Sequence, residues 1–396
     1  MPGKSTFLFI VIVIALLLAA GCAQSQQASS RQPPATAAPT ATTPSVTITV
    51  PFGPIPVESM NGVNIAYELE FSGMENMSFV PEKVEVIDAA TGKVLYSPNA
   101  SVLAKLSHRA SVPPPTAAEM QNGTARITKP RISVWFVISP DAVPERLTHR
   151  VTLNRTADNL TALTLTGGDV MVQKNLKPVV VDSPVRGPGW AVLETTSPMV
   201  HHVTSQITMS GVTRVPQRYA QDFLYLDPVT GKAYHDDMTI ARNFYGFEKE
   251  LFAVSNGTVS YARDGIPDIE ITTQKPAPSF DTALGNGVVI DLGNNKYACY
   301  GHMVNGSVRV KTGDTVTTGQ VIGLMGNTGN SDAPHLHFQV ITGSSSPLGG
   351  EGYPIVYRSF AITGTFDEDA IVGMSFATPI PQQERIMEND VIVSFP

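Results

Sequence analysis

The chain has 396 residues, which is enough for two domains of ordinary size with further segments at the ends. Its formal net charge is −7 with both signs scattered along the sequence, so no basic stripe indicates a nucleic-acid partner. The 32 glycines and 31 prolines, with an aromatic content of 7%, favour an all-β protein that contains many turns.

The first 22 residues are typical of an export signal. Lys4 supplies a positive charge, and residues 7–20 form an apolar run that is too short to span a membrane comfortably. Small residues precede Cys22, although Ala19 stands where lipoprotein signals usually have leucine. We expect Cys22 to be lipidated and to become the new N-terminus; an uncleaved anchor helix is the alternative. Either way the body of the protein lies outside the cytoplasm, and lipidation would anchor it on the outer face of the cytoplasmic membrane.

Residues 23–45 consist largely of Gln, Ser, Ala, Thr and Pro. Such a segment cannot bury a core, so we expect a disordered, extended tether that holds the folded part away from the membrane. The one other cysteine, Cys299, lies in an apolar strand-like run and is expected to pack in a core. The mature domains therefore have no internal disulfide.

From residue 46 to residue 177, short strand-like runs alternate with turns. Residues 63–71 alternate apolar and polar side chains, and residues 82–96 have the pattern of a hairpin. Regularly spaced short strands indicate an immunoglobulin-like β-sandwich. His108 and His149 are isolated in this region, so we expect them to have surface or packing roles. Further strands are predicted at residues 132–138, 148–153, 160–165 and 170–173.

A second all-β region extends from residue 178 to residue 364, with a junction at the Gly-Pro-Gly-Trp run of residues 187–190. Residues 365–396 are weakly patterned and are predicted to form a C-terminal tail, in which residues 391–395 could add a last strand.

The chemically informative stretch is residues 285–340. It contains GVVID at 287–291, YACYGH at 297–302, VKTGD at 310–314, GQVIG at 319–323, GNTGNS at 326–331 and PHLHF at 334–338. The order and spacing of these runs resemble the lysostaphin/LytM-type zinc metalloendopeptidases, and FAV at 252–254 with GTV at 257–259 also fits that family. The resemblance implies that this region adopts the antiparallel β fold of the LytM type, with its duplicated hybrid motif.

The histidine pattern supports a site independently of the resemblance. His335 and His337 alternate along a predicted strand, so their imidazoles point to the same face and can converge on one cation or one substrate carbonyl. A His-x-His motif alone is a weak signal. Together with His302 at the end of another apolar run, and Asp222 upstream, it points to a functional site.

The resemblance implies three zinc ligands: a His, an Asp four residues later, and the second His of His-x-His. Asp222 and His337 match this pattern, but Arg218 stands where the family has its first His. An arginine stays protonated and offers no lone pair to a metal. Residues 217–223 look strand-like, so we expect Arg218 and Asp222 to share a face.

Two hypotheses account for Arg218. In the first, another histidine supplies the missing ligand. His201 and His202 are the candidates, with His235 as a third. The chain resembles a family subgroup that has Arg at this position and an upstream His. In the second, the zinc site is degenerate, and Arg218 pairs with Asp222 in the place of the cation.

If zinc binds, it would activate water for attack on a peptide carbonyl. His335 would then act as general base or orient the water, and His302 would stabilise the oxyanion, alone or with Arg218. The resemblance implies peptidoglycan or another envelope peptide as the substrate. The alternative function is a non-catalytic module that binds cell-wall peptides or activates a partner hydrolase. A lipoyl-type carrier module is a poor fit, because no lysine lies between Lys311 and the His-x-His strand.

Overall fold

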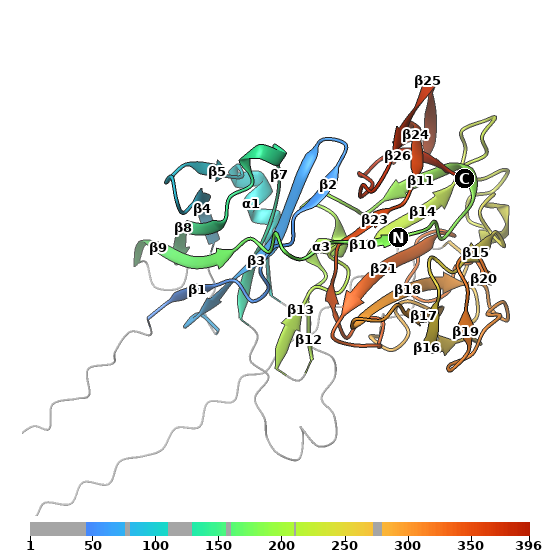
Figure 1. Ribbon diagram of the computed structural model, residues 1–396, viewed down its shortest axis with the longest axis horizontal. Helices are drawn as coiled ribbons and strands as arrows, with labels where there is room; N and C mark the ends of the chain where they lie inside the picture. Colours follow the sequence, from blue (N-terminus) through green and yellow to red (C-terminus); the bar gives the residue numbers. More distant parts are fainter. Residues whose placement is uncertain (1–44, 76–79, 110–128, 156–159, 210, 272–278) are drawn as a thin grey trace, which may run out of the picture. The chain divides into compact units, whose positions relative to one another are not determined.

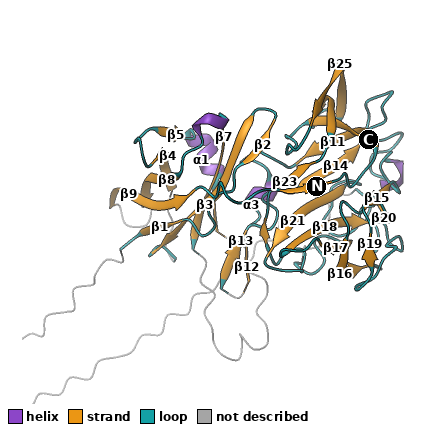
Figure 2. Ribbon diagram, viewed as in Figure 1, coloured by secondary structure: helices purple, strands orange, loops and turns teal. Residues whose placement is uncertain are grey.

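The regular secondary structure of the described residues consists almost entirely of β-strands, as Figures 1 and 2 show, and the prediction of an all-β protein is confirmed. This computed structural model describes residues 45–75, 80–109, 129–155, 160–209, 211–271 and 279–396. The predicted export signal, Cys22 and nearly all of the predicted tether lie outside these residues. Within the described residues, no helix is both long enough and apolar enough to cross a membrane.

The N-terminal strands form two antiparallel sheets that enclose a common core. One sheet has the order β1-β3-β7-β6 with β2 paired to β3, and the other has the order β5-β4-β8-β9. The core includes Tyr67 and Phe71 of β3, Val86 of β4 and Val151 of β8. We call residues 45–173 the sandwich; its immunoglobulin-like topology and its predicted boundaries at residues 46 and 177 stay predictions. Its elements are β1 Thr47–Thr49, β2 Val57–Ser59, β3 Gly62–Ser72, β4 Val80–Asp88, β5 Val94–Tyr96, α1 Ala100–Lys105, β6 Ser107–Arg109, β7 Pro130–Ile138, the 3-10 helix η1 Pro140–Ala142, β8 Arg146–Arg155 and β9 Leu160–Met171.

Strand β9 corrects one detail of the prediction. The sequence predicted two strands, at residues 160–165 and 170–173, whereas β9 runs without interruption from residue 160 to residue 171. The pairing of β8 with β9 shifts register between Leu147 and His149, opposite Gly167 and Val170. Gly168 has a φ of 69°, a conformation that glycine adopts at little cost, so the strand continues through a bulge rather than ending there.

The long strand β3 is buried on both faces. Its odd-numbered residues face the sandwich core, whereas Ala66 and Glu68 on the other face are also buried. Ala66 and Trp135 belong to an apolar cluster with Val203 and Tyr219 of the C-terminal part. The polar side chains that alternate along β3 therefore face another part of the protein rather than solvent. Contacts join residues 44–396 into one compact unit.

The C-terminal part is organised around an 11-stranded sheet of order β19-β16-β17-β18-β21-β14-β11-β26-β24-β25, with β22 paired to β21. Smaller pairs are β10 with β23, β12 with β13, and β15 with β20. The elements are β10 Val179–Val181, β11 Gly187–Leu193, α3 His201–Thr204, β12 Ile207–Met209, β13 Val212–Arg214, β14 Gln221–Tyr225, the 3-10 helix η2 Ala241–Asn243, β15 Glu250–Phe252, β16 Gly257–Arg263, β17 Asn286–Asp291, β18 Lys296–Met303, β19 Thr315–Val316, β20 Val321–Leu324, β21 Leu336–Thr342, β22 Glu351–Gly352, β23 Ile355–Tyr357, β24 Phe360–Asp367, β25 Val372–Gln382 and β26 Val391–Phe395.

Residues 365–396 are not the separate tail that the sequence suggested. Strand β26 lies between β11 and β24 in the large sheet, and β25 is the outer neighbour of β24. Consecutive residues Val391, Ile392 and Val393 are all buried, because β26 is covered on both faces. A strand buried on both faces lacks the apolar–polar alternation of a half-exposed one, which is why the pattern was weak.

Candidate metal centre

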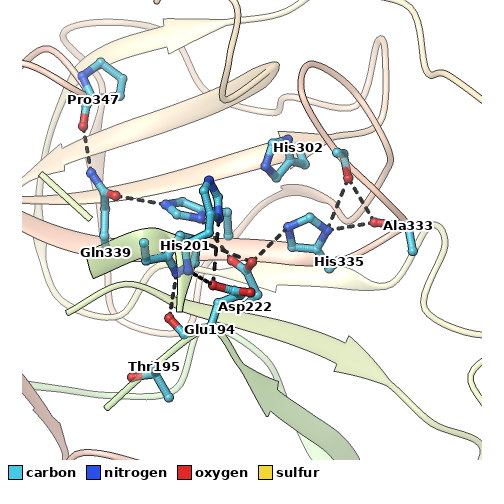
Figure 3. A network of polar contacts seen from close by, with 12 residues as sticks. Glu194, Thr195, His201, Asp222, His302, Ala333, His335, Gln339 and Pro347 are labelled. Carbon is cyan, nitrogen blue, oxygen red and sulfur yellow. Dashed lines mark hydrogen bonds and ion pairs between the residues drawn. The ribbon is translucent and has the colours of Figure 1, made fainter. Parts of the chain in front are cut away.

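Strand pairing brings Asp222 and His337 together. Asp222 on β14 lies directly opposite His337 on β21, and directly opposed residues of an antiparallel pair project from the same face. The distance from His337 Nδ1 to Asp222 Oδ1 is 2.9 Å. Both side chains are buried or nearly so, and Figure 3 shows Asp222 at the centre of a polar network. A neutral imidazole and a carboxylate at this separation are a suitable start for a metal site.

The third candidate ligand is His202, on the single helical turn α3. Its Nε2 lies 3.4 Å from Asp222 Oδ2, and its ring centroid lies 4.7 Å from that of His337. One possible ligand atom from each of His202, Asp222 and His337 lies within 4.8 Å of the other two. In the described part of the chain, this is the one cluster of three His, Cys, Asp or Glu side chains that could hold a metal ion. Two imidazole nitrogens and one carboxylate oxygen, next to an open cavity, fit a tetrahedral zinc ion with one exchangeable position.

Three histidines of the site have the same hydrogen-bonding arrangement. In each of them, Nδ1 lies next to a backbone carbonyl oxygen. A carbonyl oxygen can only accept a hydrogen bond, so Nδ1–H is the donor, and in the neutral ring Nε2 keeps its lone pair. For His202 and His335, that Nε2 lies near Asp222, at 3.4 and 3.5 Å from Oδ2. The donor–acceptor pairs are His202 Nδ1 to Glu194 O at 2.7 Å, His302 Nδ1 to Thr328 O at 2.6 Å, and His335 Nδ1 to Ala333 O at 2.7 Å.

His337 uses its nitrogens in the opposite sense. Its Nε2 lies 2.9 Å from Gln339 Oε1, and the Gln339 amide donates in turn to the Pro347 carbonyl oxygen at 2.7 Å. Because the Gln339 oxygen is the acceptor, His337 Nε2 carries a proton, and in the neutral ring Nδ1 then offers its lone pair to the site. Such outer partners orient a ligand ring and hold it in the tautomer that binds a metal.

The electrostatics of the site suit a cation. Burial lowers the pKa of His202 to about 3, and it lowers the pKa of His302 well below its usual value, so both imidazoles are neutral at pH 7. Burial by itself raises the pKa of Asp222, but the neighbouring His202, His335 and His337 lower it by a larger amount. The pKa of Asp222 is therefore below its usual value, and the carboxyl is ionised. Neutral imidazoles and an ionised carboxylate are the protonation states that bind a divalent ion.

His302 also has an unusual backbone conformation. Its φ is 60°, in the left-handed region that non-glycine residues rarely occupy. Two hydrogen bonds hold it there: His302 N–H donates to the Leu284 carbonyl oxygen at 2.8 Å, and the His302 carbonyl oxygen accepts from Gly326 N–H at 3.0 Å. Its ring centroid is 4.7 Å from that of His335, so the end of β18 directs the His302 imidazole into the site.

A cavity of about 830 Å³ contains these side chains. His202, Asp222, His302, His335 and His337 line it, and they converge from α3, β14, β18 and the β21 region. The rest of the lining includes an apolar wall of Leu193, Leu224, Phe244, Ile271 and Phe366. A concave, largely apolar pocket with a few convergent polar groups is the usual form of a substrate site.

His201 and His235 are not part of the cluster. The His201 side chain is 62% exposed and lies near the Glu194 carboxylate, with 3.8 Å between Nδ1 and Oε2. Consecutive residues of a helix point about 100° apart, so α3 can direct only one of its two histidines inwards, and that one is His202. His235 pairs with Asp236 at 2.8 Å on the surface.

Arg218 lies away from Asp222, contrary to both predicted roles. The Arg218 guanidinium pairs with Glu68 of the sandwich and with Glu351 of β22. The expectation failed because residues 216–219 form a turn and β14 begins only at Gln221, so Arg218 and Asp222 do not share a strand face. Arg218 can therefore neither stabilise an oxyanion in the cavity nor replace the cation.

Three residues with a role around the site were not predicted from the sequence: Gln339, Glu68 and Glu351. Gln339 could have been found by extending the alternation by one step, because it follows His337 by two residues on the same face of β21. Glu68 carried no local signal, since 150 residues separate it from Arg218.

Part of the chain matches a known protein family. Residues 244–347 match Peptidase family M23. The matched range contains His302, His335 and His337 but not His202 or Asp222. The peptidoglycan DD-endopeptidase ShyA of Vibrio cholerae is 40% identical over 91 residues, which is 23% of this chain and 19% of ShyA. Lysostaphin of Staphylococcus staphylolyticus is 37% identical over 99 residues, which is 23% of this chain and 20% of lysostaphin.

This chain thus matches about a fifth of the length of each of these two proteins. The catalytic domain of lysostaphin from Staphylococcus simulans is 26% identical over 31% of this chain and 84% of that domain, with a TM-score of 0.20 that carries no argument of its own. The resemblance to lysostaphin/LytM-type peptidases is confirmed, since residues 244–347 match Peptidase family M23 and lysostaphin is among the relatives.

Proposed function

We propose that this protein is a zinc-dependent endopeptidase that cleaves peptides of peptidoglycan or of another envelope polymer. The observation that carries the proposal is the convergence of His202, Asp222 and His337 in a cavity next to His302 and His335. Support for the substrate class comes from the relatives, one of which is named a peptidoglycan endopeptidase. The degenerate-site alternative depended on Arg218 next to Asp222, and Arg218 is paired elsewhere.

A zinc ion bound by these three residues would polarise the substrate carbonyl and make a water molecule nucleophilic. His335 is suited to accept the proton of that water, because its Nδ1–H is held by the Ala333 carbonyl oxygen and its Nε2 faces the site. The resulting imidazolium can return the proton to the leaving amine. The carbonyl oxygens of Glu194 and Ala333 keep His202 and His335 in position throughout.

The hydrogen bond of His302 suggests a role different from the one that the sequence predicted. With Nδ1–H directed at the Thr328 carbonyl oxygen, the neutral ring presents only a lone pair at Nε2. Burial opposes protonation of that nitrogen. We therefore assign His302 to orienting the attacking water by accepting a hydrogen bond from it, because an unprotonated Nε2 cannot donate to an oxyanion.

Metal analysis tests the proposal, with two adjacent histidines as a matched pair. Purified full-length protein should contain one equivalent of zinc and should release peptide fragments from isolated peptidoglycan. His202→Ala should lose both properties, whereas His201→Ala should keep both, because only His202 faces Asp222. Wild-type protein that stays metal-free in zinc-supplemented buffer but binds peptidoglycan peptides would instead establish a binding module.

We also propose that the protein is exported and anchored to the membrane through lipidated Cys22. Support comes from the sequence of residues 1–22 alone. Cys22→Ser should move the protein from the membrane fraction to the soluble exported fraction. Retention of the variant in the membrane fraction would favour the uncleaved anchor helix.

A further inference from the structure

The buried group of charges around Arg218 connects the sandwich to the C-terminal part. Arg218 Nε donates to Glu68 Oε1 of β3 at 3.3 Å, and a second guanidinium nitrogen pairs with Glu351 of β22. The exposed fractions are 4% for Arg218, 2% for Glu68 and 5% for Glu351. Burial lowers the pKa of Arg218, but the two carboxylates raise it overall, so the guanidinium stays charged. Removing one member of such a buried group leaves the others without compensation.

The turn that carries Arg218 leads directly to Asp222. Arg218 N–H donates to the Val215 carbonyl oxygen at 3.2 Å, and Glu351 accepts from Val215 N–H at 3.2 Å. Gly352 packs closely against the same turn: a Cβ at Gly352 would lie 2.7 Å from Val215 O and 3.0 Å from Arg218 N. The turn is therefore held by Glu68 of the sandwich and by β22, with no space to shift toward Gly352.

A second candidate ligand also lies on a segment that packs against the sandwich. Val203, next to His202 on α3, belongs to the same buried cluster as Ala66 and Trp135 of the sandwich. Tyr219, next to Arg218, packs against Trp135 with the two rings tilted by 59° and 5.5 Å between their centroids. By contrast, His337 lies inside the large sheet, between β14 and β18.

We propose that Glu68, Arg218 and Glu351 are positioning residues for the metal centre, through which the sandwich sets the affinity of His202, Asp222 and His337 for a divalent ion. The inference rests on the proposed function, because it assumes that these three residues bind a metal. The physical reason is geometric. Metal ligands must be placed to within about 0.2 Å, and two of the three ligands are carried by segments that pack against β3 and β7.

Cobalt(II) titration of the metal-free, full-length protein tests the inference, with visible ligand-field absorption as the readout. Glu68→Gln keeps the shape of the side chain and removes its charge. We expect about a 10- to 100-fold loss of cobalt affinity and a changed absorption band, as for other partners that orient metal ligands. The titration is made at a temperature at which circular dichroism shows the variant to be folded.

Glu85→Gln is the control. Glu85 is a buried carboxylate on β4, in the other sheet of the sandwich, and it pairs with Lys83 and Arg150 rather than with Arg218. This variant should lose stability but bind cobalt as the wild type does. Gly352→Ala changes no charge but would press on the same turn at Val215 and Arg218, so we expect weakened cobalt binding there too.

The outcomes separate the two proposals. Wild-type protein that binds neither cobalt nor zinc would overturn the proposed function itself. Wild-type protein that binds cobalt, with unchanged affinity and spectrum in folded Glu68→Gln or in Gly352→Ala, would overturn the positioning role alone. Equal losses in Glu68→Gln and Glu85→Gln would also overturn it, because they would show a general effect of sandwich stability.

Discussion

Replacing Gln339 by leucine should weaken zinc binding although no ligand is removed. Gln339 is fully buried, accepts from His337 Nε2–H at 2.9 Å and donates to the Pro347 carbonyl oxygen at 2.7 Å. Leucine has a similar volume but no acceptor. The His337 ring would then be free to change its tautomer or rotate, and its Nδ1 lone pair would no longer be held toward Asp222.

The magnitude follows from the two hydrogen bonds that leucine cannot make. Losing an outer partner of a metal-bound histidine costs about 10- to 100-fold in affinity, which is about 1.4–2.8 kcal/mol. Metal-free protein should also be less stable, because His337 Nε2–H stays buried without an acceptor and the half-buried Pro347 carbonyl oxygen loses its donor. Each unsatisfied group costs about 1–3 kcal/mol of unfolding free energy.

Competition with a chromophoric chelator measures the zinc affinity, and urea unfolding of the metal-free protein measures the stability. Gln339→Glu is the control, because a carboxylate still accepts from His337 Nε2–H while losing the donor to Pro347. It should keep zinc affinity near that of the wild type. Wild-type zinc affinity in Gln339→Leu would refute the argument that this hydrogen bond holds His337 in its binding tautomer.

Three further predictions concern pH, packing and the tether. Burial lowers the pKa of His149 from 6.5 to about 4, so the unfolded chain binds more protons than the folded protein between these pH values. Urea unfolding should therefore show the unfolding free energy falling by up to about 3 kcal/mol as the pH drops from 6.5 to 4. A His149→Gln variant that keeps the same pH dependence would contradict this. Phe338→Ala, at a fully buried ring 5.1 Å from that of Tyr300, should lower the unfolding free energy by about 3–5 kcal/mol, and a loss below about 1 kcal/mol would show that the site collapses around the smaller side chain. Limited proteolysis should release a soluble fragment that begins near Val46, whereas protection of residues 23–45 would argue against a tether.

Features of short range in the chain could be predicted from the sequence. The alternation in His335-Leu336-His337 places two imidazoles on one face, because the side-chain period of a strand is 2 regardless of what the strand packs against. The glycine-rich runs around this motif supported the M23 resemblance, which is confirmed. The same local reasoning placed the main sandwich strands near residues 63–71, 82–96 and 132–138.

Tertiary structure alone decided how the site is completed. The sequence offered His201, His202 and His235 as replacements for the missing ligand, and the packing of α3 directs only His202 toward Asp222. Likewise, nothing near Arg218 in the chain indicates that it pairs with Glu68, 150 residues away. The pairing of Asp222 with His337, across 115 residues, is also set by the register of β14 on β21. Register and packing depend on which surfaces the whole chain can bury together, so no local pattern of residues determines them.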